Sequence, residues 1–375
     1  MTMTDPNSLF AGARRAHMYD DSTATYPAPE EVASPTVIRD ESPKQTAHLE
    51  GPAIPPAPRG EVAQITEELL PTRRRPQTVQ APGLWQQLLI KMGAAQAPPT
   101  ETEVEDSENE RIVRQSTWTR AMSVAVVNPK GQSAKTPLTL LLAGALAEIR
   151  GGGVAAWEAT EVPGDLSDIA EGTPPRGLTE LIAAAGTIQS AGTLAGYTAP
   201  QTSHAAVIGS VSGRDEMTPE EVRTVRDLLG TYYQIDVADT ANNLQRPMLQ
   251  EVLRGADAVV VPCVVNHKSV RGLQRALVAI ERVPGLSDRT VLVVTHDGGP
   301  EDAEFSRHLT EQLTRRYRVR AMVEVPYDPA IRADGELTYS ALQPQTRHTI
   351  RRVARHVVEA FNDAPMNRHH NPESE

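Results

Sequence analysis

The sequence is poor in cysteine, in long apolar runs and in large aromatic residues. Its one cysteine, Cys263, excludes a disulfide within the chain and fits a reducing, cytoplasmic environment. No apolar run approaches the roughly 18–20 residues that span a bilayer. The first residues show no basic start followed by an apolar core, so no secretory signal is evident. We therefore expect a cytoplasmic protein with no stable membrane insertion.

The chain also has no excess of basic residues, because its formal net charge is −11. This balance does not favour nucleic-acid binding by bulk charge, although it can hide a local basic face. Aromatic residues make up only 4% of the chain, whereas alanine and valine are abundant. A core of that composition suits parallel strands that helices cover on both faces.

Residues 1–120 differ in composition from the rest and hold 14 of the 30 prolines. They include the proline-rich stretch EGPAIPPAPRGE and the acidic run ETEVEDSENE. Such sequence buries too little apolar surface to offset chain entropy, so we predict that most of 1–120 is disordered. The segment GLWQQLLIKMG at 83–93 has its apolar residues at helical spacing. We expect a short amphipathic helix there, which either packs on the folded domain or binds a regulatory protein partner or a membrane surface.

From residue 121 onward, strand patterns alternate with helix patterns. Seven strands are expected, at 122–127, 154–157, 205–210, 233–238, 258–262, 290–295 and 319–325. Helices are expected at 137–150, 219–230, 244–255, 269–282, 301–317 and 346–361. In the second of these helices Thr218 and Glu221 form a capping box, and Gly230 is expected to end the helix. The alternation predicts a doubly wound, mostly parallel α/β sheet over 121–362, followed by a polar tail at 363–375.

The loop after the first expected strand has features of a phosphate-binding loop. The general pattern G-x-x-x-x-G-K-[ST] fails here, because Pro129 and Ala134 occupy the glycine positions. Lys135 and Thr136 nevertheless come directly before the helix expected at 137–150, whose N-terminus suits phosphate. Lys135 would bridge the β- and γ-phosphates, and the Thr136 hydroxyl would bind Mg²⁺. Pro137 falls in the first helical turn, where its missing N–H costs little.

A second frame through the same loop fits a known family. The segment KGQSAKT, which starts at Lys130, resembles the deviant Walker A loop K-G-G-x-x-K-[ST] of ParA/MinD ATPases, with Gln132 in place of the second glycine. YYQIDVADTANN resembles the Walker B strand of that family, and VEVPYDPAIR resembles a late strand whose proline segment lies against adenine. The resemblance covers about 121–362. GLWQQLLIKMG and RGGGVAAWE are also similar to an actinobacterial MinD-like branch, some members of which lie near type VII secretion systems.

The resemblance implies a P-loop NTPase fold with ATP and Mg²⁺ as ligands. It implies that Lys130 reaches across a sandwich homodimer to the phosphates of the partner, and that Asp239 joins Thr136 at Mg²⁺. The nucleotide-binding positions that it implies are Gly131, Gln132, Ser133, Ala134, Lys135, Thr136, Pro137, Pro326 and Asp328. A residue other than glycine at position 132 weakens binding if that position requires positive φ, by on the order of 1–2 kcal/mol.

The second strand departs from the family pattern. Members of the family commonly end this strand with D-x-D, and the second aspartate positions the attacking water. The corresponding residues here are Glu158 and Thr160, followed by Glu161. Thr160 can orient a water but cannot act as a base at neutral pH, and Glu161 is a candidate to replace it. We therefore expect ATP binding with slow hydrolysis, and a pseudo-ATPase stays open as an alternative.

The segment TRHTIRRVARHVVEAF predicts a late amphipathic helix. Arg347, Arg351, Arg352 and Arg355 form a stripe on the side away from its apolar face. The stripe is either an ordinary solvated face or a non-specific contact surface for DNA phosphates, as in ParA-like proteins. The tail that follows lacks the amphipathic C-terminal helix by which MinD proteins dock on membranes, which argues against that mode of cycling.

Four further polar residues are expected to be structural. Asp236 lies inside the Walker B strand and is interpreted as a paired carboxylate, and Cys263 as a core residue. His267 and His296 follow apolar strands and are interpreted as ordinary loop histidines, with a place in the lining of the site as the alternative. Neither has neighbours at zinc-ligand spacing.

Three functions are consistent with these observations. The first is an ATPase whose ATP-bound homodimer binds DNA non-specifically, in DNA partition or cargo positioning. The second is a nucleotide-regulated accessory protein of a type VII secretion system. The third is a pseudo-ATPase scaffold.

Overall fold

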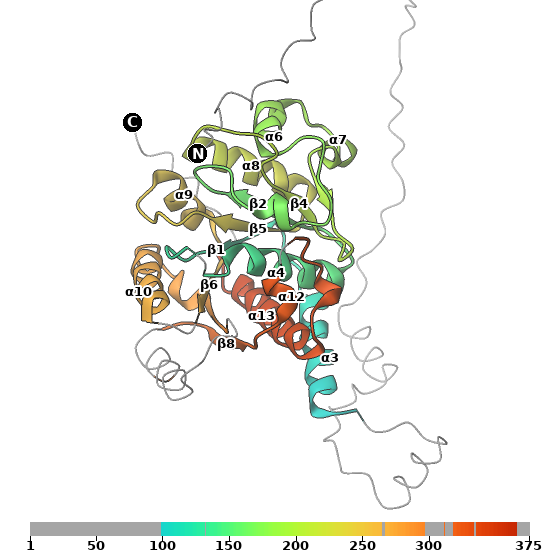
Figure 1. Ribbon diagram of the computed structural model, residues 1–375, viewed down its shortest axis with the longest axis vertical. Helices are drawn as coiled ribbons and strands as arrows, with labels where there is room; N and C mark the ends of the chain where they lie inside the picture. Colours follow the sequence, from blue (N-terminus) through green and yellow to red (C-terminus); the bar gives the residue numbers. More distant parts are fainter. Residues whose placement is uncertain are drawn as a thin grey trace, which may run out of the picture. The chain divides into compact units, whose positions relative to one another are not determined.

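The computed structural model describes the chain between residues 99 and 365 (Figure 1). Within that span, the residues that it does not describe are 132, 265–266, 297–310, 312–317 and 334, and for 267–270 it gives the backbone alone. The expected helices at 83–93 and 301–317, Gln132, the His267 side chain and the end of the tail lie outside the described residues.

An eight-stranded sheet forms the centre of this part, in the order β3-β4-β2-β5-β1-β6-β7-β8. All neighbouring strands are parallel except β3, which pairs antiparallel with β4. The strands are β1 (Met122–Val126), β2 (Val154–Ala159), β3 (Ala199–Pro200), β4 (Ala206–Ile208), β5 (Ile235–Thr240), β6 (Ala258–Val264), β7 (Thr290–Thr295) and β8 (Ala321–Val325). The predicted doubly wound parallel sheet is confirmed. The one strand that was not predicted is β3, which is only two residues long.

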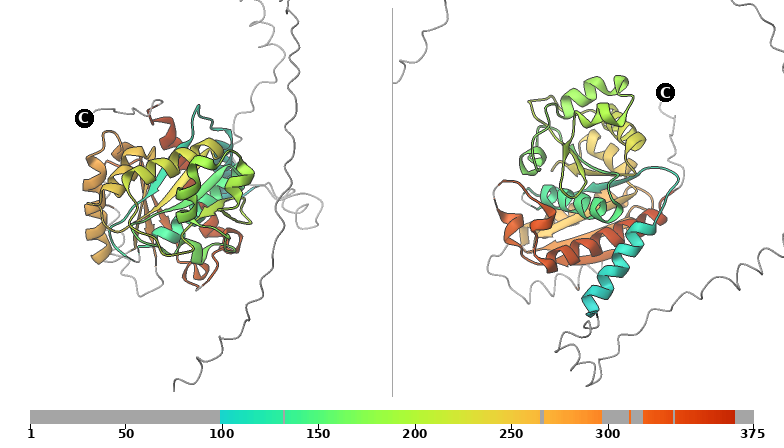
Figure 2. Two further views of the ribbon diagram at one scale, coloured as in Figure 1. Left: turned by 90° about the horizontal axis from the view of Figure 1, so that it is seen from above. Right: turned by 90° about the vertical axis from the view of Figure 1, so that its right-hand side faces the viewer.

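Helices cover both faces of the sheet, and alternate residues of its strands therefore enter two separate apolar clusters. Val124 and Val126 pack with α4 and α13 on one face, whereas Ala125 packs with α6, α8, α9 and α10 on the other. Figures 1 and 2 show the helices on the two faces of the sheet. The longer helices are α3 (Glu101–Gln115), α4 (Lys135–Arg150), α8 (Pro219–Tyr232), α9 (Pro247–Gly255), α10 (His267–Glu281) and α13 (Pro344–Asn362). The shorter ones are α5 (Leu166–Ile169), α6 (Leu178–Ala184), α7 (Ala191–Ala195) and α12 (Pro329–Arg332), with 3₁₀ turns at Ala185–Thr187, Ser287–Arg289 and Tyr339–Ala341. Among the described residues, no helix is long and apolar enough to cross a membrane.

The acidic run ETEVEDSENE is not disordered but forms most of α3. Thr100 caps this helix in a capping box with Glu103, which satisfies the first free N–H groups. Val113 is fully buried against α4 and α13, and just beyond the helix the Trp118 ring meets Phe361 edge-on, with 5.1 Å between centroids. Composition did not predict this helix, because its partners lie in α4 and, more than 200 residues further along the chain, in α13.

Several expected boundaries move, and two of these shifts matter for packing or for the site. The capping box of Thr218 and Glu221 is present, but α8 continues past Gly230 to Tyr232. A Cβ on Gly230 would lie 3.3 Å from the Cβ of Ala121, so this glycine allows close packing and does not end the helix. Strand β5 runs two residues further than expected, which places Asp239 inside the strand, at the carboxyl edge of the sheet.

Candidate functional site

The loop between β1 and α4 places the N-terminus of α4, which no side chain caps, at the carboxyl edge of the sheet. Ala134 precedes the helix with φ 62° and ψ 27°, in the left-handed region, and no side chain caps the helix. The first turn of α4 carries no acidic residue, so its N–H groups and the helix dipole can act on an anion. The Ser133 hydroxyl beside it is buried and has no hydrogen-bond partner among the described residues. This arrangement fits a phosphate group.

Thr136 and Asp239 form the second component of the site. The Thr136 hydroxyl donates to Oδ2 of Asp239 at 2.7 Å, while Oδ1 of Asp239 is buried and has no partner in the described part of the chain. Burial raises the pKa of Asp239 to about 6, although the Thr136 hydrogen bond and the Lys135 charge act in the opposite direction. A divalent cation would bind this oxygen and offset the burial of its charge, so the residues present fit Mg²⁺.

Lys135 is nearly buried and points to the neighbouring loop. Its Nζ donates to Oδ1 of Asn242 at 2.6 Å, in the loop that follows β5. Burial lowers the pKa of Lys135, whereas the charge of Asp239 raises it. No motif indicated Asn242, because carboxamides in polar loops are common in any sequence.

A cavity of 390 Å³ joins the phosphate loop to the ends of β7 and β8. Polar residues from both sides line it, together with an apolar wall that includes Leu138, Ile169 and Val325. The polar lining includes Ser133, Lys135, Thr136, Asp165, Asn242, Thr295, His296, Asp328 and Arg332. A cavity with a helix N-terminus and polar groups on one side and an apolar wall on the other fits a ligand of the size and chemistry of a nucleotide.

Pro326 and Asp328, the predicted adenine contacts, both line this cavity. The Asp328 carboxylate, however, accepts the backbone N–H groups of Ala330 at 3.0 Å and Gln343 at 2.8 Å. It therefore caps α12 and shapes the wall, with both oxygens engaged. The Thr295 hydroxyl is buried, lines the cavity and has no partner among the described residues, whereas His296 contacts Glu324 at 2.6 Å.

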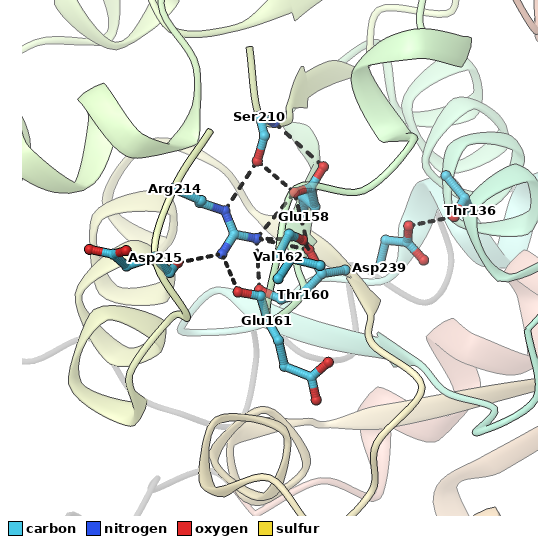
Figure 3. A network of polar contacts seen from close by, with 9 residues as sticks. All are labelled: Thr136, Glu158, Thr160, Glu161, Val162, Ser210, Arg214, Asp215 and Asp239. Atoms are coloured by element: carbon cyan, nitrogen blue, oxygen red, sulfur yellow. Dashed lines mark hydrogen bonds and ion pairs between the residues drawn. The ribbon is translucent and has the colours of Figure 1, made fainter. Parts of the chain in front are cut away.

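Glu158 and Thr160 do not line the cavity. Glu158 is 0% exposed, and its Oε1 accepts from the Ser210 hydroxyl at 2.6 Å and from Arg214 at 3.1 Å. The Thr160 hydroxyl donates to the Val162 carbonyl at 2.6 Å and accepts from Arg214 at 2.8 Å (Figure 3). In this conformation solvent cannot reach the Glu158 carboxylate, so it is not placed to contact an attacking water.

Arg214 organises the loop after β2. Its side chain is 4% exposed and donates to the carbonyls of Thr160 at 2.7 Å and Glu161 at 3.1 Å (Figure 3). The Glu161 carboxylate points away from Thr136 and Asp239 in this view, and it lies 3.7 Å from Arg246. Burial raises the pKa of Glu161, with Arg246 opposing. Sequence reasoning missed Arg214, because a lone arginine in a polar loop carries no signal of its partners.

The arginine stripe of α13 faces α3. The contacts that join the two helices are Arg351–Asp106 at 3.2 Å, Arg352–Glu105 at 3.0 Å, Arg355–Asn109 at 3.2 Å and His348–Asp106 at 2.7 Å. Arg347 has no ion pair with any described carboxylate. Lys130 is exposed next to Gly131, which lines the cavity.

The remaining predicted residues are structural where they are described. Asp236 is buried and accepts from the Ser123 hydroxyl at 2.5 Å and from the Trp157 indole at 2.9 Å. Cys263 is buried in the core as predicted, and burial raises the pKa of its thiol to about 12.

Comparison with known proteins shows which solved structures have a similar fold. No protein-family model matches the chain. The crystal structure of a ParA family ATPase from Chlorobium tepidum TLS matches with a TM-score of 0.51 at 16% identity, over 62% of this chain and 97% of that one. The fold is therefore that of the ParA/MinD-like P-loop ATPases.

One curated relative is similar in sequence. The ESX-1 secretion-associated protein EspI of Mycobacterium tuberculosis is 24% identical over 256 residues, in the strains H37Rv and CDC 1551 alike. The match covers 64% of this chain and 37% of EspI, so the chain spans little more than a third of the length of that relative.

Proposed function

We propose that this chain binds ATP with Mg²⁺ and hydrolyses it slowly. One observation carries the proposal. Lys135 and Thr136 open α4 beside a buried Asp239 carboxylate, one oxygen of which has no partner in the described residues. The fold and the cavity support the same proposal, because ligands of open parallel α/β sheets bind at the carboxyl ends of the strands, where these residues meet.

Each residue has a specific task in the proposed complex. The N–H groups of the first turn of α4 hold the phosphates, and Lys135 moves from Asn242 to the β- and γ-phosphate oxygens. Thr136 and Asp239 hold Mg²⁺, which neutralises charge that develops on the phosphates. The apolar wall and Pro326 hold the base. Hydrolysis is slow because Glu158 is buried and the Thr160 hydroxyl is already bonded within its own loop.

The test measures ATP affinity and phosphate release for the full chain, next to Lys135→Ala. We expect wild type to bind MgATP and Lys135→Ala to bind at least about tenfold more weakly, because a charge-assisted contact is worth roughly 1.5–3 kcal/mol. The matched control is Arg282→Ala, which removes an exposed positive charge that does not line the cavity. Absence of binding by wild type would refute the proposal.

We also propose an ATP-dependent homodimer that Lys130 completes. The exposed position of Lys130 next to the cavity supports this, and so does the resemblance of the loop. We expect MgATP to shift wild type to a dimer in sedimentation. Lys130→Ala should stay monomeric while it still binds ATP. A dimer that forms equally without nucleotide would point to the scaffold alternative.

For the biological role, an accessory function in secretion has more support than DNA partition. The similarity to a secretion-associated protein favours it, and most of the α13 arginines are engaged by α3. The proposed compartment is the cytoplasm, where MgATP is abundant. Partition predicts ATP-dependent binding to duplex DNA that weakens steeply with salt, and a secretion role predicts ATP-dependent binding to a secretion component without DNA affinity.

A further inference from the structure

Asp165 is a carboxylate of the β2 loop that faces the nucleotide cavity. It lines that cavity together with Lys135, Thr136 and Asn242. Its side chain is exposed, does not cap α5, and makes no hydrogen bond or ion pair with another described residue. The carboxylate is therefore available to a ligand, in contrast to Glu158.

Contacts on both sides of Asp165 fix its position. Before it, Arg214 holds the carbonyls of Thr160 and Glu161. After it, the Asp165 carbonyl accepts the N–H groups of Asp168 at 3.1 Å and Ile169 at 3.3 Å, and the next side chain is fully buried. A carboxylate at a defined place beside a phosphate site can orient a water without reorganising the loop.

Asp165 shares its cavity with the proposed metal site. Thr136, the proposed ligand of Mg²⁺, and Lys135, the proposed phosphate contact, line the same cavity as Asp165. The carboxylate is therefore exposed to the space that the phosphates and Mg²⁺ would occupy.

The neighbouring acids do not meet these conditions. Glu158 is fully buried, and Glu161 faces Arg246 and does not line the cavity. Asp168 is exposed one turn further along α5 but does not line the cavity either.

We propose that Asp165 is the catalytic carboxylate that orients the attacking water and accepts its proton, and that Arg214 is the positioning residue that holds the loop for it. The inference rests on the proposed ATP hydrolysis. The water oxygen forms a bond to the γ-phosphorus, while the bond from that phosphorus to the β–γ bridging oxygen breaks. Its electron pair stays on ADP. Asp165 takes one proton from the water and releases it to solvent, since the side chain is exposed.

The experiment compares Asp165→Asn with Asp168→Asn, which makes the same change one turn away. We expect Asp165→Asn to bind ATP with an affinity within about threefold of wild type. Its single-turnover hydrolysis should fall by about 100-fold, the usual contribution of a positioned acid–base group. Asp168→Asn should behave as wild type in both measurements.

A second readout does not depend on turnover. ADP with aluminium fluoride and Mg²⁺ mimics the transferring phosphoryl group, and its affinity is compared with that of ADP alone by calorimetry. Asp165→Asn should lose about tenfold in affinity for the mimic and none for ADP, because the lost contact exists only near the transition state.

Arg214→Lys tests the positioning residue while it keeps the buried positive charge. We expect slower hydrolysis with unchanged ATP affinity, and no additional loss in the double variant with Asp165→Asn. Equal hydrolysis by Asp165→Asn and wild type, or a parallel loss of ATP affinity, would overturn the inference. Wild type that binds ATP without hydrolysing it would overturn the inference together with the proposed hydrolysis and leave the proposed ATP binding standing, whereas wild type that fails to bind ATP would overturn the whole proposed function.

Discussion

Ala134 carries a Cβ at a backbone position that favours glycine, with φ 62° at the entrance to α4. From the sequence, positive φ was considered at position 132. Among the described residues of the loop, the residue with left-handed backbone angles is Ala134, directly before Lys135. The strain of a residue other than glycine in that region is roughly 1–2 kcal/mol. The sequence cannot show which residue of a loop adopts positive φ, because that depends on how the loop closes onto the helix.

Ala134→Gly should therefore stabilise the protein. The strain energy that is relieved exceeds the entropic cost of glycine, which has more freedom in the unfolded chain and costs about 0.4–1 kcal/mol. The free energy of unfolding should therefore rise by about 0.5–1 kcal/mol. Urea denaturation without nucleotide measures it. Ala143→Gly, in the buried interior of the same helix, should instead lose at least about 1 kcal/mol, because it also removes a methyl group from the core. A loss of stability in both variants would contradict the argument.

Asp239 should make the nucleotide-free protein less stable as pH rises. Burial raises the pKa of Asp239 in the folded protein from 3.8 to about 6. The protonated carboxyl therefore makes its full contribution to the free energy of unfolding below the pKa of the unfolded chain, and this contribution is lost as pH rises through about 6. Asp239→Asn keeps the shape of the side chain without the charge. By pH 7 the free energy of unfolding of this variant should exceed that of wild type by about 2–3 kcal/mol. Denaturation curves from pH 4 to 7 in the presence of a chelator measure the difference. Parallel curves for the two proteins would refute this prediction.

At the scale of elements, the sequence was most informative where a pattern is local. Strands β1 and β7 lie where apolar periodicity placed them, and the helix expected after the phosphate-binding loop is present as α4, which begins at Lys135, two residues before the expected start. Helix α3 was missed because its stability comes from a helix that lies far along the chain. Asp165, Asn242 and Arg214 were missed for a similar reason, since their partners are set by which loops meet at the edge of the sheet.

The contact between α3 and α13 should depend on Arg351 more than on Arg347. Arg351 is 19% exposed and lies within 3.5 Å of carboxylate oxygens of Asp106, Glu110 and Glu148. Arg351→Ala removes the arginine that these partly buried carboxylates share, and a loss of about 1–2 kcal/mol is expected, between the values for surface and buried pairs. Arg347→Ala should change stability by less than about 0.5 kcal/mol. Thermal or urea unfolding distinguishes the two, and equal effects would show that the ion pairs contribute little.

At the scale of the whole molecule, the candidate site draws on loops after β1, β2, β5, β7 and β8. These strands are parallel, so their carboxyl ends meet at one edge and bring together residues from Gly131 to Arg332. A ligand that occupies this edge contacts several segments at once. Binding should therefore stabilise the entire fold and not one loop alone.

MgATP should raise the melting temperature of the full chain in a manner that depends on Lys135. A ligand at 100 times its Kd stabilises the folded state by about 2.7 kcal/mol. For a domain of this size each kcal/mol corresponds to roughly 2–4 °C, so a shift of about 5–10 °C is expected. Differential scanning fluorimetry measures it, with a chelator to remove Mg²⁺ and with Lys135→Ala to remove the phosphate contact. Both changes should reduce the shift. Mg²⁺ offsets the buried negative charge of Asp239, and the Lys135 ammonium offsets the negative charge of the phosphates. An undiminished shift in Lys135→Ala would mean that ATP binds somewhere other than the edge of the sheet.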